Sequence, residues 1–319
     1  MARANAVYYA ERDPYADFTT SPEITQVFGE VLGLWAAVTW DAMGRPDPVL
    51  LTECGPGRGT LMADALRAIS NVAAPFRAAL RVHLVETSPR LRAQQAARVP
   101  DAAWHDALAD VPPGPLILLA NEFLDALPIR QLVRRGIGWA ERFVDGGALV
   151  EQPAAAPDLD PAQVEEGAIT ELCEPARAVV GHVARRVARD GGAALFLDYG
   201  PAESAPGDSL QALRNGRPAS PFDEPGNADL TAHVDFGALA RVARAAGAVA
   251  HGPMPQGVFL TRLGLFQRTG RLARTQPPMR AAALVQAAQR LAEPDRMGRL
   301  FKAMAVCHGD LPCPAGFEP

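Results

Sequence analysis

Long apolar runs and lysine are the two features that this sequence most clearly lacks. No stretch approaches the roughly 18 apolar residues that a membrane-spanning helix needs. The start, MARANAVYYAERDPY, has no apolar segment after its charges, so we expect no secretory signal. Lys302 is the only lysine in the sequence. Apart from the histidines, all the other basic residues are arginines. Together with abundant Ala, Pro and Gly, this bias is typical of a high-GC coding sequence and indicates no function by itself.

Cysteine is scarce too, and an excess of positive charge is absent. The four cysteines (Cys54, Cys173, Cys307, Cys313) show neither CxxC pairing nor metal-ligand spacing. We interpret them as reduced thiols of a bacterial cytoplasmic protein and predict no metal site. The formal net charge of -5 argues against a general nucleic-acid binder. With 319 residues, of which 48% are hydrophobic and 21% charged, the chain is long and apolar enough for a large globular domain.

The first half of the sequence alternates strand and helix patterns. Residues 22–43 carry apolar residues at helical spacing, with Ser21 expected as the N-cap and Pro22 in the first turn. Buried strands are expected at 48–54, 80–86, 102–105 and 115–121. Helices are expected over 59–69 and from Ser88 and Pro89 onward. This alternation predicts an α/β fold with a mainly parallel sheet.

The pattern changes after residue 128. Residues 128–151 alternate and break at glycines, which predicts antiparallel hairpins added to the sheet rather than another crossover. Residues 201–229 are rich in Pro, Gly, Asp and Asn and are expected to be a long loop; loops of that length are usually functional or disordered. Between and after these segments we expect a helix at 175–190, a strand at 193–200, a helix at 235–246 and a strand at 301–307.

A glycine-rich turn, ECGPGRGT, separates the first predicted strand from its helix. Gly55, Gly57 and Gly59 would let a cofactor approach the backbone at a helix N-terminus. No Gly-Lys-Ser/Thr follows, and the GxGxG spacing is not the GxGxxG dinucleotide fingerprint. Glu53 would repel a pyrophosphate but suits a cofactor with an ammonium group, such as S-adenosylmethionine. The structural alternative for Glu53 is an acid that faces the helix dipole.

Two further acids end the next predicted strands. Glu86 stands where a doubly wound sheet offers a carboxylate to ribose hydroxyls. Its alternative is a solvated glutamate at a strand end. Asp106, after the third strand, could meet the adenine edge, and a simple turn aspartate is the alternative. We therefore predict a cofactor site that contains Glu53, the three glycines, Glu86 and Asp106.

Several stretches together resemble the MidA-type S-adenosylmethionine-dependent methyltransferases, a family that includes the mitochondrial complex I assembly methyltransferase. The stretches are DFTTSPEITQVFGE, ECGPGRGTLMADALR, VHLVETSPRLRAQQ, NEFLDALP, LDYG, ADLTAHVDF and MGRLFKAMA. The resemblance implies a class I methyltransferase fold, which is Rossmann-like with a seven-stranded, mostly parallel sheet and a smaller lobe of hairpins and helices. It also implies S-adenosylmethionine as methyl donor and, in the mitochondrial branch, arginine methylation of a core complex I subunit.

On this basis we expect one methyltransferase domain over residues 1–319. Insertions at about 128–175 and 201–233 would form a substrate lobe. The resemblance implies that the loop with Asp17, Thr20 and Ser21 folds over the cofactor; an N-cap cluster is the structural alternative. Relatives usually have an additional N-terminal helix before this pair of tyrosines, whereas here Tyr8 and Tyr9 lie close to the first residue. We therefore expect either a truncated start or a shorter cap over the cofactor.

The stretch LILLANEFLDALP carries the predicted catalytic residues. Asn121 and Glu122 end the fourth strand, and Asp125 follows three residues later. Ligands of doubly wound sheets bind outside the carboxyl ends of the strands. A guanidinium stays protonated, so paired carboxylates would orient it and take up its positive charge. Tyr199 and His233 are the residues we place in the acceptor pocket.

The same residues also have purely structural interpretations. Asp125 could cap the following turn, Glu122 could hydrogen-bond a neighbouring loop, and Tyr199 could be a half-buried tyrosine at a strand end. For the whole protein we predict a protein acceptor, with neither nucleic acid nor membrane insertion. The alternatives are a small-molecule methyltransferase, a non-catalytic cofactor-binding assembly factor and, more remotely, a nicotinamide oxidoreductase. The sequence does not indicate an oligomeric state.

Overall fold

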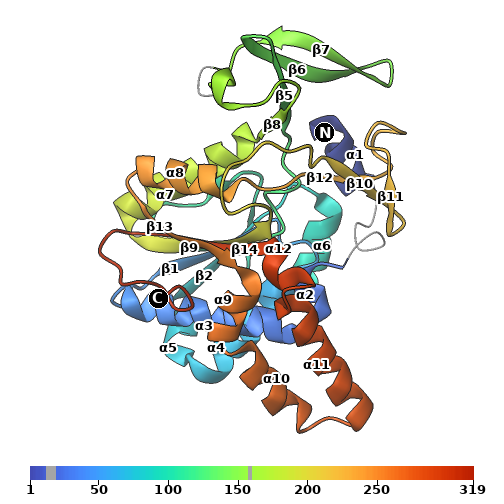
Figure 1. Cartoon of the computed structure of the whole chain (residues 1–319). Coiled ribbons are helices and arrows are strands. Elements are labelled where there is room, and N and C mark those ends of the chain that lie inside the picture. Colours follow the sequence, from blue (N-terminus) through green and yellow to red (C-terminus); the bar gives the residue numbers. More distant parts are fainter. Residues whose placement is uncertain (12–18, 157–159) are drawn as a thin grey trace.

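A seven-stranded sheet forms the centre of the protein. The structure is a computed structural model that describes residues 1–11, 19–156 and 160–319 (Figure 1). The strand order is β13-β14-β9-β4-β1-β2-β3. All neighbours are parallel except around β14, which runs antiparallel to both β9 and β13. These strands are β1 (Val49–Cys54), β2 (Leu80–Val85), β3 (Ala103–His105), β4 (Leu116–Asn121), β9 (Gly192–Tyr199), β13 (Val249–Pro255) and β14 (Phe301–Cys307).

Helices cover both faces of this sheet (Figure 1). The helices are α1 (Ala2–Glu11), α2 (Ser21–Ile24), α3 (Gln26–Ala42), α4 (Thr60–Val72), α5 (Ala74–Ala79), α6 (Pro89–Arg98), α7 (Glu174–Asp190), α8 (Phe236–Ala245), α9 (Gln256–Arg262), α10 (Leu265–Ala273), α11 (Pro278–Ala292) and α12 (Met297–Leu300). α3 and α4 lie on one face and α7 and α8 on the other. The helices and strands predicted between residues 48 and 121 are confirmed, with ends shifted by one to three residues.

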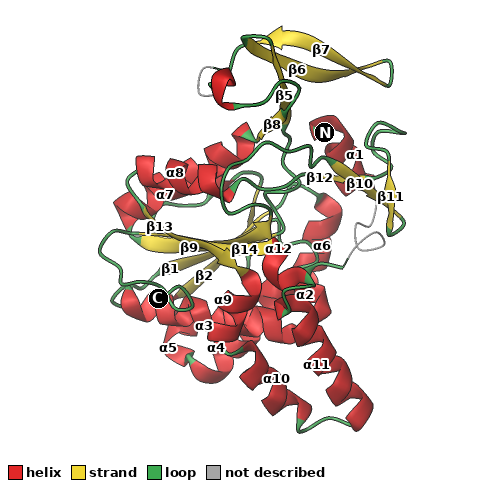
Figure 2. Cartoon of the chain, in the orientation of Figure 1, coloured by secondary structure: helices red, strands yellow, loops and turns green. Residues whose placement is uncertain are grey.

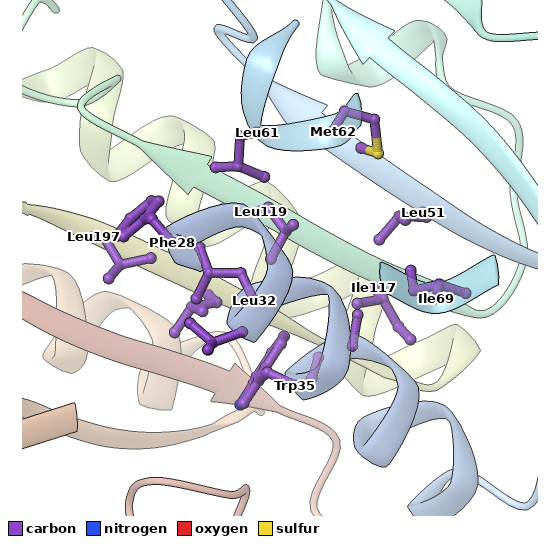
Figure 3. Close-up of a cluster of buried hydrophobic side chains, with 14 of the residues drawn as sticks. Phe28, Leu32, Trp35, Leu51, Leu61, Met62, Ile69, Ile117, Leu119 and Leu197 are labelled. Atoms are coloured by element: carbon purple, nitrogen blue, oxygen red, sulfur yellow. The ribbon is translucent and has the colours of Figure 1, made fainter. Parts of the chain in front are cut away.

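The central strand β4 is covered by helices on both faces, and this explains why its residues before Asn121 are all apolar. Ile117 and Leu119 pack into the cluster beneath α3 and α4, whereas Leu116 and Leu118 pack into the cluster beneath α7 and α8. Successive side chains of a strand point to opposite faces, so a sheet covered twice must be apolar at every position. Figure 3 shows the first cluster, in which Trp35 and its neighbours on α3 lie against the sheet.

Close contact between α3 and α4 depends on glycine. A Cβ added at Gly33 would lie 2.7 Å from Cα and from the carbonyl oxygen of Ala65. At Gly29 it would lie 2.7 Å from Cβ of Asp64. Since the atoms at Gly33 are backbone, they cannot turn away as a flexible side chain could. The distance between these two helices is therefore set by the missing side chains.

We expect Gly33→Ala to lower the free energy of unfolding by about 1–3 kcal/mol through overpacking, despite the better helix propensity of alanine. Urea unfolding measures the change. Gly270→Ala in α10 is the matched control, because nothing lies within 4 Å of its added Cβ. That control should be neutral or should stabilise the protein by up to about 1 kcal/mol. Equal effects of the two substitutions would contradict the tight contact.

The hairpins after β4 form a separate sheet, so the prediction that they extend the main sheet is wrong. This sheet has the order β7-β6-β5-β8 and stands above the main body in Figure 2. Its strands are β5 (Arg130–Arg135), β6 (Gly138–Asp145), β7 (Ala148–Ala154) and β8 (Ile169–Leu172). Residues 201–229 are likewise not purely loop. They contain β10 (Gln211–Arg214) and β11 (Arg217–Ala219), which join β12 (Asp229–Thr231) in a third sheet beside α1.

The helix predicted over 22–43 is two helices. Thr25 has extended φ and ψ and separates α2 from α3, and its side chain accepts a hydrogen bond from the Val27 backbone. Thr20, not Ser21, is the residue that precedes α2, so the predicted N-cap at Ser21 is wrong. The backbone NH of Ser21, at the start of α2, donates to the side chain of Glu122. Across the described ranges, no helix is long and apolar enough to cross a lipid bilayer.

Candidate active site

A cavity of about 450 Å³ lies at the carboxyl ends of β1, β2 and β4. This is the edge at which ligands of doubly wound sheets bind. Its lining comes from five places along the chain: the glycine turn after β1, the end of β2, the end of β4, the start of α2 and the helix α1. The residues that matter for the chemistry are Asn5, Tyr9, Thr20, Glu23, Glu53, Gly55, Gly57, Thr60, Glu86, Asn121, Glu122 and Phe123.

The glycine turn has the backbone that only glycine adopts readily. Gly55, Gly57 and Gly59 have φ values of 65°, 54° and 78°. A Cβ at Gly55 would also lie 2.8 Å from the ring of Phe123, so the turn and the segment after β4 touch directly. Gly55 and Gly57 line the cavity. Gly59 precedes α4, and it is Thr60 and Leu61 at the start of that helix that reach the cavity.

Glu53 is a buried acid aimed into the cavity. It is 3% exposed, and its Oε2 finds no hydrogen-bond partner in the described part of the chain. Burial raises the pKa of this carboxyl to about 8, and a backbone hydrogen bond from Met62 opposes that shift only in part. A cation bound beside Glu53 would supply the missing partner and favour the ionised carboxylate.

Glu86 also lines the cavity and is held in place by two donors. Its Oε1 accepts a hydrogen bond from the Ser88 backbone at 2.8 Å, and its Oε2 accepts one from Nε2 of Gln95 at 3.2 Å. Burial raises the pKa of Glu86. Gln95 also donates to the carbonyl of Gly57 at 2.8 Å and accepts from the Trp104 indole.

Gln95 therefore joins the glycine turn to Glu86, and sequence analysis assigned it no role. It is fully buried on α6, where a glutamine is unusual. It belongs to the quoted stretch VHLVETSPRLRAQQ, but the sequence does not show which of two adjacent glutamines points inward. Asp106 lies elsewhere. It is exposed, bonds to Arg92 at 2.7 Å and is not among the residues that line the cavity.

The segment before α3 closes one side of the cavity. Thr20 and Glu23 line it, and the Thr60 hydroxyl donates to Glu23 at 2.5 Å. The backbone NH of Ser21 donates to Oε1 of Glu122 at 2.8 Å. Through that bond the segment is tied to the end of β4. Asp17, which we expected in the same loop, lies outside the described residues.

The turn after β4 brings Asn121 and Glu122 to the cavity but not Asp125. Glu122 has a φ of 49°, a left-handed conformation that is uncommon for a residue with a side chain. Its carboxylate accepts from Ser21 and from Nδ2 of Asn121 at 3.0 Å, while burial raises its pKa. Oδ1 of Asn121 is buried and has no hydrogen-bond partner within the described ranges.

Asp125 instead belongs to a group of buried carboxylates next to the cavity. It is 7% exposed, and its Oδ1 is not hydrogen-bonded by any described residue. Burial and the charges of Asp198, Glu122 and Asp229 raise its pKa well above the usual range. Asp229 accepts a hydrogen bond at 2.8 Å from the hydroxyl of Tyr9, which lines the cavity. We name Glu122, Asp125, Asp198 and Asp229 the acid cluster.

Tyr199 and His233 lie together, though neither lines the main cavity. Their ring centroids are 5.6 Å apart in an edge-on arrangement. The Tyr199 hydroxyl donates to Thr231 at 2.5 Å and accepts from Gln211 at 3.1 Å. Burial, with the charges of Asp125 and Asp198, raises the pKa of Tyr199, which places it near the acid cluster. Among the described residues, no three or more His, Cys, Asp or Glu side chains are arranged so that they could hold a metal ion together.

The strand order, the reversed strand β14 and the glycine turn with its flanking acids define a class I methyltransferase. Comparisons with known proteins agree. Residues 31–254 match the family Methyltransf_28, described as "Putative S-adenosyl-L-methionine-dependent methyltransferase", and the chain belongs to this family. The protein is thus an S-adenosylmethionine-dependent methyltransferase, as the resemblance to MidA-type enzymes implied.

Relatives and solved structures span nearly the whole chain. The mitochondrial protein arginine methyltransferase NDUFAF7 of Danio rerio is 34% identical and covers 94% of this chain and 79% of its own. Its Drosophila melanogaster homologue is 34% identical over 98% and 80%. A COG1565 superfamily protein of Burkholderia thailandensis bound to S-adenosylhomocysteine has 28% identity and a TM-score of 0.77 over 94% and 81%. A native structure from the same organism has 29% identity and a TM-score of 0.81 over 99% and 88%.

Proposed function

We propose that this methyltransferase transfers its methyl group to an arginine side chain of a protein. The acid cluster is the observation that carries the proposal, because several carboxylates share a buried space beside the cavity and Asp125 has an oxygen without a partner. A guanidinium is always charged and offers a planar set of donors that fits paired carboxylates. Its entry would replace repulsion among the acids with charge-assisted hydrogen bonds. The names of the NDUFAF7 relatives support the same acceptor.

S-adenosylmethionine fits the cavity because it can bind polar groups of the cavity lining that lack a hydrogen-bond partner. We assign Glu53 to the ammonium group, the turn of Gly55 and Gly57 to close backbone contact, and Glu86 to the ribose hydroxyls. The unpartnered oxygens of Glu53 and Asn121 are the structural basis of this assignment. When bound, the cofactor supplies a methyl group on a sulfonium cation. Thr20 takes part in covering it, and Asp106 remains a weaker assignment for the adenine edge.

The residues of the turn after β4 orient the acceptor and receive its proton. Glu122 already faces the cavity and is fixed by Ser21 and Asn121. Asp125 stands on the other side of the same turn, with a raised pKa. A carboxylate whose pKa is raised is the better base for the proton that the guanidinium nitrogen gives up after methylation. Holding the nitrogen in line with the methyl group is the other requirement of the reaction.

The two insertions serve as the substrate lobe in this proposal. The backbone NH of Ala232 donates to the carbonyl of Asp125, so the second insertion touches the catalytic turn. The first insertion is joined to the second through Gln131, which donates to both Glu171 and Asp208. Tyr199 and His233 lie where these segments meet the main sheet.

The acceptor class is tested with methyl-labelled S-adenosylmethionine in a lysate from cells that lack this protein. We expect a labelled protein band and, after acid hydrolysis, label in methylarginine. Glu122→Gln combined with Asp125→Asn should lower incorporation by at least about 100-fold, the lower end of the usual range for lost acid–base groups. Binding of S-adenosylhomocysteine should stay within a few-fold. Asp295→Asn, at an exposed acid outside the site and outside both insertions, is the control variant.

The other outcomes identify the alternatives. Label found only in small molecules would point to a small-molecule acceptor and overturn the proposal. Respiratory-complex assembly that survives the double substitution would point to a non-catalytic assembly factor. We place the acceptor on a respiratory complex I subunit or its bacterial equivalent, in the bacterial cytoplasm. Mass spectrometry of the labelled band tests that assignment directly.

A further inference from the structure

Residues 236–292 contain no aspartate or glutamate at all. Within these 57 residues there are eight arginines, so the segment carries a formal charge of +8 in a protein whose net charge is -5. The remaining residues therefore carry -13. Arg241 and Arg244 of this segment lie on α8, on the other face of the sheet from α10 and α11, and Arg268 pairs with Glu30. The arginines of α10 and α11 that have no such partner indicate a basic surface that meets an anionic partner.

The same segment includes a pair of helices that projects from the body of the molecule (Figure 1). α10 and α11 form an antiparallel hairpin that extends away from the body, on the side opposite the small sheets (Figures 1 and 2). Its base is anchored firmly. Leu265 and Leu291 are fully buried in the main core, and Arg268 pairs with the buried Glu30 of α3 at 2.7 Å. The hairpin is a rigid extension of the core, and its tip is the free end.

The tip combines unpaired cations with an exposed apolar side chain. Arg271, Arg274 and Arg280 are exposed and have no ion pair or side-chain hydrogen bond with any described residue. Met279 lies between the last two in sequence and is 87% exposed, the second most exposed of the large hydrophobic side chains described. These four residues, which we name the hairpin tip, lie within ten positions of the chain around the turn at Pro277.

We propose that the hairpin tip docks on a lipid surface that carries anionic headgroups. Three arginines next to a protruding methionine suit such a surface, since the cations meet lipid phosphates while the thioether enters the acyl boundary. The convex shape fits a flat and deformable partner. Single-stranded nucleic acids are held by aromatic side chains on which bases stack, and the tip has none. This proposal does not depend on which group the enzyme methylates.

Vesicle flotation with the full-length protein tests the proposal. We expect binding to vesicles of phosphatidylcholine mixed with phosphatidylglycerol, little binding to phosphatidylcholine alone, and loss of binding in high salt. Replacing Arg271, Arg274 and Arg280 by glutamate should weaken binding on the order of 100-fold, since each basic residue near an anionic surface contributes about fivefold. Met279→Ser should weaken it several-fold with no change in charge.

A charge-matched variant separates local docking from bulk attraction. Arg81, Arg185 and Arg217 are exposed and lie outside the hairpin, so replacing them by glutamate changes the net charge equally. That control should bind vesicles within a few-fold of the unmodified protein. All variants should keep their urea midpoint and their affinity for S-adenosylhomocysteine, which shows that they fold.

Three results would overturn the proposal. One is no binding to anionic vesicles at low salt, and a second is an equal loss in the hairpin and control variants. The third is salt-sensitive self-association, seen by sedimentation velocity and abolished by the hairpin variant, in a protein that does not bind vesicles. In that case the tip meets the acidic remainder of a second copy of this chain.

Discussion

Glu53→Gln is expected to weaken the binding of S-adenosylmethionine by roughly 10- to 100-fold, the loss typical of a hydrogen bond to a charged group. Glutamine keeps the size of the side chain but removes the charge that pairs with a cationic ligand. The substitution also removes the cost of ionising a carboxyl that is 3% exposed. The variant should thus bind its cofactor worse while its ligand-free form becomes more stable at alkaline pH.

The pH dependence of that effect follows from the direction of the pKa shift. The native carboxyl has a pKa of about 8, against 4.5 for an unperturbed glutamate. Because the native state holds this proton at higher pH than the unfolded chain does, the contribution of protonated Glu53 to stability is complete below about pH 4.5. It is lost as the pH rises through about 8. The unmodified ligand-free protein should lose stability over this range more steeply than Glu53→Gln.

Two measurements check the prediction. Isothermal titration with S-adenosylhomocysteine gives the affinities, and urea unfolding of the ligand-free proteins near pH 6 and pH 8 gives the stability difference. In the unmodified protein affinity should rise with pH over this range, since binding a cation favours ionised Glu53. If Glu53→Gln changes stability but leaves the affinity unaltered, Glu53 is a structural acid and its assignment to the cofactor is wrong.

Asp198→Ala is expected to lower the free energy of unfolding by about 3 kcal/mol or more, because it leaves four backbone donors without their acceptor. Oδ2 of Asp198 accepts hydrogen bonds from the backbone NH groups of Phe123, Leu124 and Asp125 at 3.2, 2.9 and 3.2 Å. Oδ1 accepts from the Tyr199 backbone at 2.9 Å. The carboxylate is 1% exposed, so water cannot replace it. These bonds hold the turn that gives Glu122 its left-handed backbone.

Asp198→Asn distinguishes positioning from simple stability. The amide keeps one oxygen for the three donors but turns an NH₂ group toward the Tyr199 NH. We expect a smaller loss of stability, unchanged affinity for S-adenosylhomocysteine and a methylation rate reduced at least about tenfold by misplaced catalytic groups. Asp41→Asn, which removes one partner of an exposed ion pair with Arg45, should change stability by less than about 1 kcal/mol. Unchanged unfolding of Asp198→Ala would mean that other contacts hold the turn.

The sequence pattern was sufficient to predict a strand, helix or turn wherever its own residues determine its conformation. The run before Asn121 had to be a strand covered on both faces, and the glycines after Glu53 had to form the turn before α4. Pattern failed for Ser21, because helical spacing continues through Thr25 although the backbone there is extended. It failed again for residues 201–229, whose short strands are stabilised by pairing with each other rather than by their composition.

The candidate site divides in the same way. Glu53, Glu86, Asn121 and Glu122 end parallel strands or follow them directly, and strand ends meet at one edge, so their convergence could be expected from the sequence. Gln95 could not, since its contacts reach across 38 residues to Gly57. Asp106 follows β3, an edge strand of the sheet, and its side chain bonds to Arg92, a direction that the sequence does not indicate; its assignment to the adenine edge stays a prediction.

The sequence by itself determined the class of fold, the family and the methyl donor, because these depend on local periodicity, on glycines at a strand end and on motifs read in order. Only the tertiary structure decided that Glu122 faces the cavity while Asp125, three residues later, lies among other acids. That difference comes from the left-handed backbone at Glu122 and from the bonds of Asp198, which is more than seventy positions away. Spacing along the chain cannot specify a direction that distant residues impose.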